Sequence, residues 1–258
     1  MSYFIAITGK GGVGKTTLAG LLVSRLIARG NQPVLAVDAD PNSCLDGALG
    51  VTVVKSIGRL REEAREESKK GLGAGVSKQE MIELKIAESL VESKDFDLIA
   101  MGRPEGPGCY CYANNVLKEA LGKISASYPY VVLDNEAGLE NLSRRIVQKV
   151  NLLIMVADAS KKGIETLVRL HALAKEMDTR YDQLAIIINR LRRTEMMPEL
   201  EALKAKLGAD ILVCIPDNEE LAFQAEAGHP LSGLPAANPV VAKVDELLAQ
   251  VLGKGTRH

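Results

Sequence analysis

The sequence predicts an α/β protein built on one mostly parallel, twisted sheet of about seven or eight strands, with helices on both faces. Apolar, β-branched runs alternate with amphipathic helical patterns along nearly all of its 258 residues. Most of these runs are continuously apolar, as in strands that are buried on both faces. The composition, 47% apolar and 25% charged, is typical of a globular protein long enough to bury a core.

The expected strands recur along the sequence in a regular order. They cover residues 3–8, 33–37, 96–101, 130–134, 152–157, 184–189 and 210–214. Helical patterns such as LAGLLVSRLIARG lie between them, and Gly30 stands where a C-cap ends that helix. We therefore expect a single domain over residues 1–252, followed by a flexible tail over 253–258.

The stretch from 47 to 95 interrupts this order. It is rich in Glu, Lys and Arg and carries the run KKGLGAGVSK. We expect a helical insertion here, made of surface helices and a loop between two core strands. A segment that contacts a partner protein is the alternative, although no motif supports it.

Charge and hydropathy exclude several classes of protein. The formal net charge is −1, which predicts no strong attraction to nucleic acid or to an anionic membrane. No apolar run approaches the ~20 residues of a membrane span. The first residues run from Met directly into a strand pattern without a leader, so we expect a cytoplasmic protein with reduced thiols.

A glycine-rich loop, GKGGVGKTT, lies between the first strand and the first helix. Gly9, Gly11 and Gly14 fit the dinucleotide fingerprint, with Asp38 at a plausible distance for a ribose contact. The same stretch fits the phosphate loop G-x-x-x-x-G-K-[ST], and what opens the helix decides between the two. A dinucleotide-binding fold needs neither a cation nor a hydroxyl at the start of the helix. A nucleoside triphosphate site needs both: Lys15 would bind the β/γ oxygens, and Thr16 would bind Mg²⁺.

We therefore predict a P-loop ATPase that binds ATP or ADP with Mg²⁺. The expected phosphate-binding residues are Gly9, Lys10, Gly11, Gly12, Val13, Gly14, Lys15, Thr16 and Thr17. The run from Lys10 to Thr16 resembles the K-G-G-x-G-K-[ST] pattern of the deviant Walker A ATPases, the MinD-like members of the SIMIBI class. That resemblance implies a homodimer closed by ATP, in which the catalytic Lys10 reaches the partner's phosphates.

Acidic side chains follow two of the expected strands. Asp38 and Asp40 fall at the carboxyl edge of the sheet, where two carboxylates can ligate Mg²⁺ or its water shell and orient an attacking water. The resemblance associates Asp40 with hydrolysis, and DPNS is also turn chemistry. At the end of the strand at 130–134, Asp134 is expected in the outer coordination shell of Mg²⁺. The N–H of Gly138, four residues later, is expected at the γ-phosphate.

The base of the nucleotide is expected near the ends of two later strands. The resemblance implies that Asn189 recognises adenine, with Arg190 against the base or simply exposed. The loop that contains Pro216 and Asp217 is similar to the one that lines the base in that family. An asparagine at a strand end is also a common turn former.

The four cysteines divide into two kinds. Cys44 and Cys214 stand singly, and we expect small buried side chains. Cys109 and Cys111 form C-x-C, too close for an unstrained disulfide. Three roles stay open for this pair: an incidental reduced pair, half of a Ni²⁺ or Zn²⁺ site completed across a two-fold dimer axis, or half of an iron–sulfur cluster.

The sequence outside 52–95 resembles the CooC-type and AcsF-type maturation ATPases. The shared features are the deviant Walker A loop, VDADPNSCL, the C-x-C pair near the middle of the sequence, and DNEAGLENLSR, with Asn141 in place of a common His. The resemblance implies ATP-dependent nickel insertion into carbon monoxide dehydrogenase or acetyl-CoA synthase, with Cys109 and Cys111 as metal ligands. Two alternatives stay open: an iron–sulfur reductase resembling the nitrogenase iron protein, and a positioning ATPase of the MinD or ParA kind.

Overall fold

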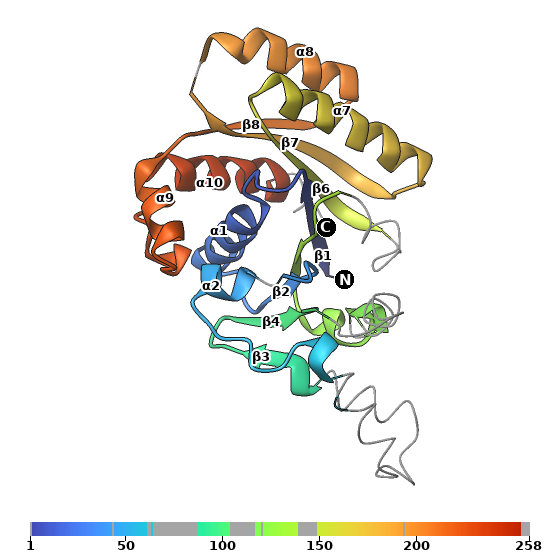
Figure 1. Ribbon diagram of the computed structural model, residues 1–258, viewed down its shortest axis with the longest axis vertical. Helices are drawn as coiled ribbons and strands as arrows, with labels where there is room; N and C mark the ends of the chain where they lie inside the picture. Colours follow the sequence, from blue (N-terminus) through green and yellow to red (C-terminus); the bar gives the residue numbers. More distant parts are fainter. Residues whose placement is uncertain are drawn as a thin grey trace.

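The computed structural model describes residues 2–42, 44–60, 63, 87–103, 117–119, 121–138, 149–192 and 194–253. In this part of the protein one eight-stranded sheet has the order β3-β4-β2-β5-β1-β6-β7-β8 (Figure 1). The strands are β1 (Tyr3–Gly9), β2 (Val34–Asp38), β3 (Leu90–Glu92), β4 (Phe96–Ala100), β5 (Tyr130–Asp134), β6 (Val150–Asp158), β7 (Tyr181–Leu191) and β8 (Ile211–Pro216). All neighbours are parallel except β3 and β4, which confirms the predicted fold class.

Helices cover both faces of the sheet (Figure 1). The described helices are α1 (Lys15–Ala28), α2 (Leu45–Leu49), α7 (Lys161–Glu176), α8 (Met197–Leu207), α9 (Glu219–Glu226) and α10 (Pro239–Leu252). Short 3-10 turns are η1 (Ser125–Ser127), η2 (Thr194–Met196) and η3 (Leu231–Gly233). The helices α1 and α10 lie on one face, and α7 and α8 lie on the other.

The core consists of two apolar clusters separated by the sheet. Along β1, Ile5 and Ile7 pack into the cluster with α1 and α10, whereas Ala6 packs into the cluster with α7 and α8. This alternation follows from the two-residue period of a strand. Burial on both faces explains why the strand sequences are continuously apolar.

One strand was missed in the sequence. Residues 90–92, expected within the helical insertion, form the edge strand β3 antiparallel to β4. Three residues are too few to show a two-residue period, and an edge strand needs no apolar side chains on both faces. The prediction of a helical insertion is therefore wrong at 90–92.

The carboxyl ends of the parallel strands meet at one edge of the sheet. Asp38 at the end of β2 is in register with Asp134 at the end of β5, and Asp134 is in register with Ile7 of β1. Since β1 is followed directly by the glycine-rich loop, the fold brings that loop and the two acids together, as ligand sites in open α/β sheets require.

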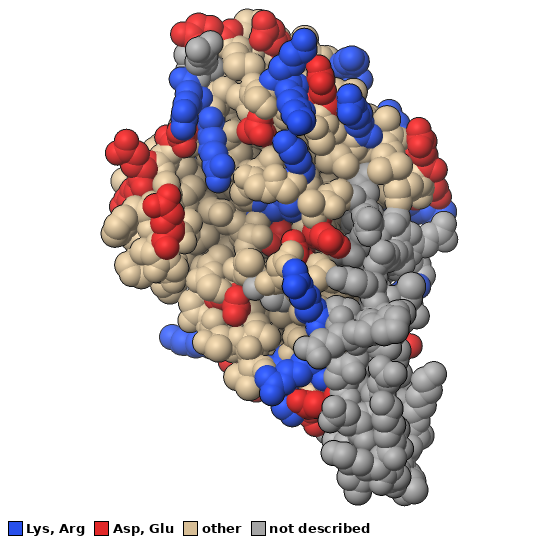
Figure 2. All heavy atoms as spheres, viewed as in Figure 1, with Lys and Arg blue, Asp and Glu red and all other residues tan. Residues whose placement is uncertain are grey.

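The surface carries no large field of one sign in the face shown in Figure 2, where basic and acidic side chains of the described residues are interspersed over the upper part of the molecule. Acidic side chains gather over α9, which carries Glu219, Glu220 and Glu226. Among the described helices none combines the length and the apolar character needed to cross a bilayer.

Candidate nucleotide site

The loop between β1 and α1 has the backbone of an anion cradle. Gly12 and Gly14 have φ of 78° and 93°, which glycine adopts without strain. A Cβ on Gly9 would collide with the carbonyl oxygen of Val156 on β6, so only glycine fits there. Gly14 caps α1 without a side-chain hydrogen bond, so no side-chain cap competes with an anion at the start of α1.

Lys15 lies at the centre of this cradle. Its side chain is mostly buried, and its Nζ donates to the carbonyl oxygen of Lys10 at 3.3 Å. Burial lowers the pKa of Lys15, and the neighbouring charges of Asp134 and Asp40 work against that effect. An anionic phosphate in the cradle would restore the preference for the charged amine. Lys10 itself is exposed.

Two buried carboxylates face the cradle from the sheet edge. Asp38 is 1% exposed and accepts from the backbone N–H of Asp40 at 3.1 Å and of Leu45 at 3.0 Å. Asp134 is also 1% exposed, and neither of its oxygens accepts a well-formed hydrogen bond in the part of the protein that the structure describes. Burial raises the pKa of Asp38 to about 6 and that of Asp134 to about 7, and the nearby hydroxyl of Thr16 opposes the second shift.

A buried carboxylate without a full set of partners costs stability unless a cation or a donor meets it. The hydroxyl of Thr16 and the carboxylates of Asp38 and Asp134 are the oxygen ligands that Mg²⁺ prefers, directly or through water. The residues present therefore fit a magnesium ion with a nucleotide, and such an ion would meet the oxygens of Asp134.

Asp40 and its neighbours close the site toward solvent. Asp40 accepts from the backbone N–H of Asn42 at 2.8 Å and from its side-chain amide at 3.0 Å, which is the Asx turn that DPNS predicts. The cavity here measures about 410 Å³. It is lined by Gly11, Gly12, Gly14, Lys15, Thr16, Asp40, Asn42, Glu136, Ala137 and Arg190. Sequence analysis missed Asn42 and gave Glu136 no role, because spacing alone does not show which side chains line the opening.

Gly138 is bound to the loop. Its N–H donates to the carbonyl oxygen of Gly9 at 3.1 Å, and its own carbonyl accepts from the hydroxyl of Thr8. The N–H expected at the γ-phosphate is therefore engaged with the first glycine of the loop, at a residue with φ of 96°.

The end of β7 also meets the loop. The side-chain amide of Asn189 donates to the carbonyl oxygen of Val13 at 2.8 Å. The guanidinium of the exposed Arg190 lies 3.4 Å from the carbonyl oxygen of Gly12. The structure thus brings both residues to the loop. The resemblance predicts Asn189 at adenine and leaves Arg190 either against the base or exposed, and Arg190 is exposed.

Pro216 and Asp217 stand one strand further along. Pro216 ends β8 and is half-buried, and Asp217 is exposed and paired with Arg192 at 2.7 Å. Asn218 caps α9 by accepting from the N–H of Leu221 at 2.8 Å. The loop expected to line the base thus carries a surface ion pair and leads into the capped helix α9.

The cysteine pair falls on a part of the sequence without a structural description: Cys109 and Cys111 lie outside the described residues. Cys44 corrects an expectation, since its side chain is exposed rather than buried, while Cys214 is half-buried. In the described ranges, no three His, Cys, Asp or Glu side chains form a group that could hold a metal ion.

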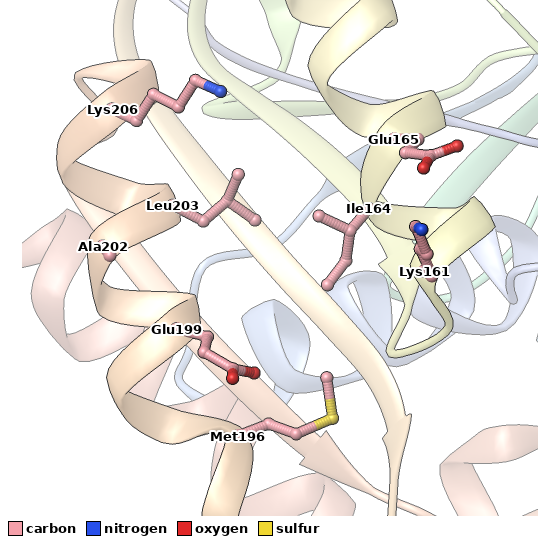
Figure 3. A pocket seen from close by; sticks show the side chains of 8 residues that line it. All are labelled: Lys161, Ile164, Glu165, Met196, Glu199, Ala202, Leu203 and Lys206. Carbon is pink, nitrogen blue, oxygen red and sulfur yellow. The ribbon is translucent and has the colours of Figure 1, made fainter.

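A second cavity, of about 530 Å³, lies between α7 and α8 (Figure 3). Ile164 and Leu203 point toward each other across it, and the charged ends of Lys161, Glu165 and Lys206 lie around them. We name this feature the α7–α8 groove. Its centre is apolar and its charged lining residues belong to the surfaces of the two helices, whereas the loop cavity lies beside buried carboxylates and a mostly buried lysine. The loop cavity is therefore the better candidate for the active site.

Comparison with known proteins places these features in a family context. A family model described as an AAA domain matches residues 2–186. An uncharacterized ATP-binding protein of Methanocaldococcus jannaschii is 41% identical over 255 residues, which are 97% of this chain and 98% of that protein. The carbon monoxide dehydrogenase accessory protein CooC of Rhodospirillum rubrum is 30% identical over 185 residues, 67% of this chain and 69% of its own length. A ParA family ATPase from Chlorobium tepidum has the same fold, with a TM-score of 0.71 and 16% identity over 96% of this chain and 98% of its own.

Proposed function

Because this chain belongs to the AAA-domain family of P-loop ATPases, in its MinD and ParA type, we propose that ATP hydrolysis here drives the capture and release of a soft metal ion. The ion we propose is nickel, delivered to carbon monoxide dehydrogenase or acetyl-CoA synthase. The observation that carries this proposal is the C-x-C pair in a protein that is 30% identical to CooC.

Thiolates suit Ni²⁺ and Zn²⁺, and geometry decides which ion a thiolate site holds. One subunit supplies two thiolates in C-x-C, and a two-fold dimer supplies the four of a closed tetrahedral site. Such a shared site exists only while two subunits are held together, so a change in subunit spacing would release the ion.

The ATP cycle would control that spacing. We assign Lys15 to the β/γ oxygens, Thr16 to Mg²⁺, Asp38 and Asp134 to its water shell, and Asp40 to the attacking water. Mg²⁺, when bound, neutralises the charge that develops on the phosphate oxygens. Lys10 is exposed and free to reach across a dimer, where it would contact the phosphates held by the partner.

Metal content of the anaerobically purified protein, measured with Ni²⁺ or Zn²⁺ and with or without ATP, tests this proposal. We expect one ion for each pair of subunits, lost in Cys109→Ser and Cys111→Ser while ATP binding is kept. The matched controls are Cys44→Ser and Cys214→Ser, which remove the other two cysteines and should retain the ion. Unchanged metal content in the Cys109→Ser and Cys111→Ser variants would contradict the proposal.

Two other outcomes have distinct readouts. A visible absorption band that is lost in the same two variants would identify an iron–sulfur reductase instead. A positioning ATPase would show ATP-dependent binding to DNA or to lipid vesicles. Against membrane binding, the apolar residues of α10, among them Val244, Leu248 and Val251, are buried against the core and give this helix no free apolar face.

A further inference from the structure

The floor of the phosphate loop is bonded to the end of a strand two places away in the sheet. Asn189 lies two residues before the end of β7, is 7% exposed, and donates through Nδ2 to the carbonyl oxygen of Val13 at 2.8 Å. Its Oδ1 accepts from the backbone N–H of Arg190 at 3.0 Å. Each polar atom of this buried amide therefore already has a partner within the protein.

The backbone around Asn189 is shaped for this contact. Arg190 has φ of 55°, a conformation that a residue other than glycine keeps only where its surroundings hold it. The pairing of β7 with β8 shifts register between Ile188 and Leu191, so regular pairing is interrupted around the pair. From this position the Arg190 guanidinium lies 3.4 Å from the carbonyl oxygen of Gly12. Two consecutive side chains thus bond two consecutive carbonyl groups of the loop.

Gly14 shows how close the approach is. A Cβ on Gly14 would lie 2.5 Å from Nδ2 of Asn189, nearer than side-chain atoms tolerate. Two reasons therefore restrict the position before Lys15 to glycine: its φ is 93°, and the Asn189 amide leaves no room for a Cβ.

We propose that Asn189 is a positioning residue for phosphate binding, which holds the carbonyl oxygens of the loop away from the phosphates so that its N–H groups face them. A carbonyl turned into the cavity would repel an anion and remove a donor from the cradle. Asn189 then acts on phosphate binding through the loop, whose carbonyl orientation it sets. The proposal rests on ATP binding alone and is independent of any metal cargo.

The test compares ligands that share phosphates but differ in the base. Affinities for ATP, GTP and inorganic tripolyphosphate, each with Mg²⁺, are measured by calorimetry for the wild type, Asn189→Ala and Asn189→Asp. Loss of one buried hydrogen bond should lower all three affinities by about tenfold, with the ratio of ATP to GTP affinity unchanged. A loss confined to ATP, with tripolyphosphate affinity as in the wild type, would overturn the proposal and make Asn189 a base-reading residue.

Asn151→Ala is the matched control. Asn151 lies at the opposite end of the sheet, where its Oδ1 accepts from the N–H of Phe4 at 2.8 Å. Asn151→Ala therefore also loses a hydrogen bond between an asparagine side chain and the backbone, together with the bond from Nδ2 to Asp182 at 3.1 Å. We expect its unfolding midpoint to fall with tripolyphosphate affinity unchanged. An equal loss of tripolyphosphate affinity in this variant would reduce the role of Asn189 to general stability and contradict the proposal.

A second measurement uses the contact between Asn189 and Gly14. Gly14→Ala should weaken tripolyphosphate binding strongly in the wild type, where the new Cβ meets Nδ2. In the Asn189→Ala background that collision is gone, so the additional loss should be smaller. Strictly additive losses would show that the amide does not determine the loop and would contradict the proposal. If Asn189→Ala does not fold, Asn189→Asp, which keeps the side-chain volume, replaces it in the affinity measurement. Asn189→Ser, whose shorter side chain also removes the collision, replaces it in the Gly14→Ala comparison.

Discussion

The loop cavity and the α7–α8 groove differ in the state of their polar groups. In the loop cavity, buried charges stand without full partners: among the described residues neither oxygen of Asp134 accepts a well-formed hydrogen bond, and Lys15 is mostly buried. In the groove, apolar side chains such as Ile164 and Leu203 face each other, and the charged groups lie around them. The groove is the larger of the two cavities, so size does not identify the site; uncompensated charge does.

Removal of the Lys15 amine should have the largest effect. In Lys15→Ala the phosphate oxygens lose their cation, and we expect ATP hydrolysis to fall by about 10²–10³-fold. Steady-state ATPase rates measure this loss. Glu199→Gln, a charge change at the groove, should leave the rate unchanged; a comparable loss there would erase the distinction between the two cavities.

Asp134→Asn should separate activity from stability. Replacing a buried carboxylate that lacks full partners by a neutral amide should raise the unfolding midpoint of the nucleotide-free protein at pH 8. The same change weakens the hold on Mg²⁺, so we expect the hydrolysis rate to drop by about 10²-fold. A destabilised variant with wild-type activity would show that Asp134 is structural.

Leu203→Ala in the groove should lower stability and leave ATP hydrolysis unchanged, the opposite of the effects expected for Asp134→Asn. Leu203 is 8% exposed and packs in the cluster beneath α8, so its truncation should cost about 2 kcal/mol of unfolding free energy. Urea titration measures this cost. Because Leu203 does not line the loop cavity, the rate of hydrolysis should stay within about twofold of the wild type.

The dependence of stability on pH tests the buried carboxylates of the loop cavity directly. Asp38 and Asp134 have pKa values of about 6 and 7, raised by burial above the ~3.9 of the unfolded state. The folded state therefore binds more protons than the unfolded state between about pH 4 and 7, and the free energy of unfolding should fall as pH rises through that window. Denaturation at several pH values, compared between the wild type and Asp134→Asn, isolates the contribution of Asp134 from that of other titrating groups. Equal slopes in the two proteins would contradict the prediction.

The sequence predicted the sheet well because the physics of its strands is local. Continuous apolar runs such as the one at 152–157 are explained by burial on both faces, and β6 lies there. The glycine-rich loop was also predictable, since its backbone is dictated by residues such as Gly12 and Gly14 with positive φ.

What the sequence did not show depends on contacts between distant residues. The bond from Asn189 to Val13 joins positions 176 apart, so no spacing rule reveals it. The exposure of Cys44 likewise depends on how α2 packs against α1, and β3 was too short to leave a pattern. A turn-forming asparagine and a loop-bonding asparagine look the same until the fold places them.

The division of the core by the sheet has a consequence for how the sequence of this protein can change over time. Side chains at alternate strand positions belong to separate clusters, so most substitutions behind α7 and α8 do not contact the packing behind α1 and α10. Pairs of substitutions that are far apart combine additively. Substitutions in α7 and α8 should therefore alter packing on their own face of the sheet and leave the layer that supports the start of α1 largely unchanged.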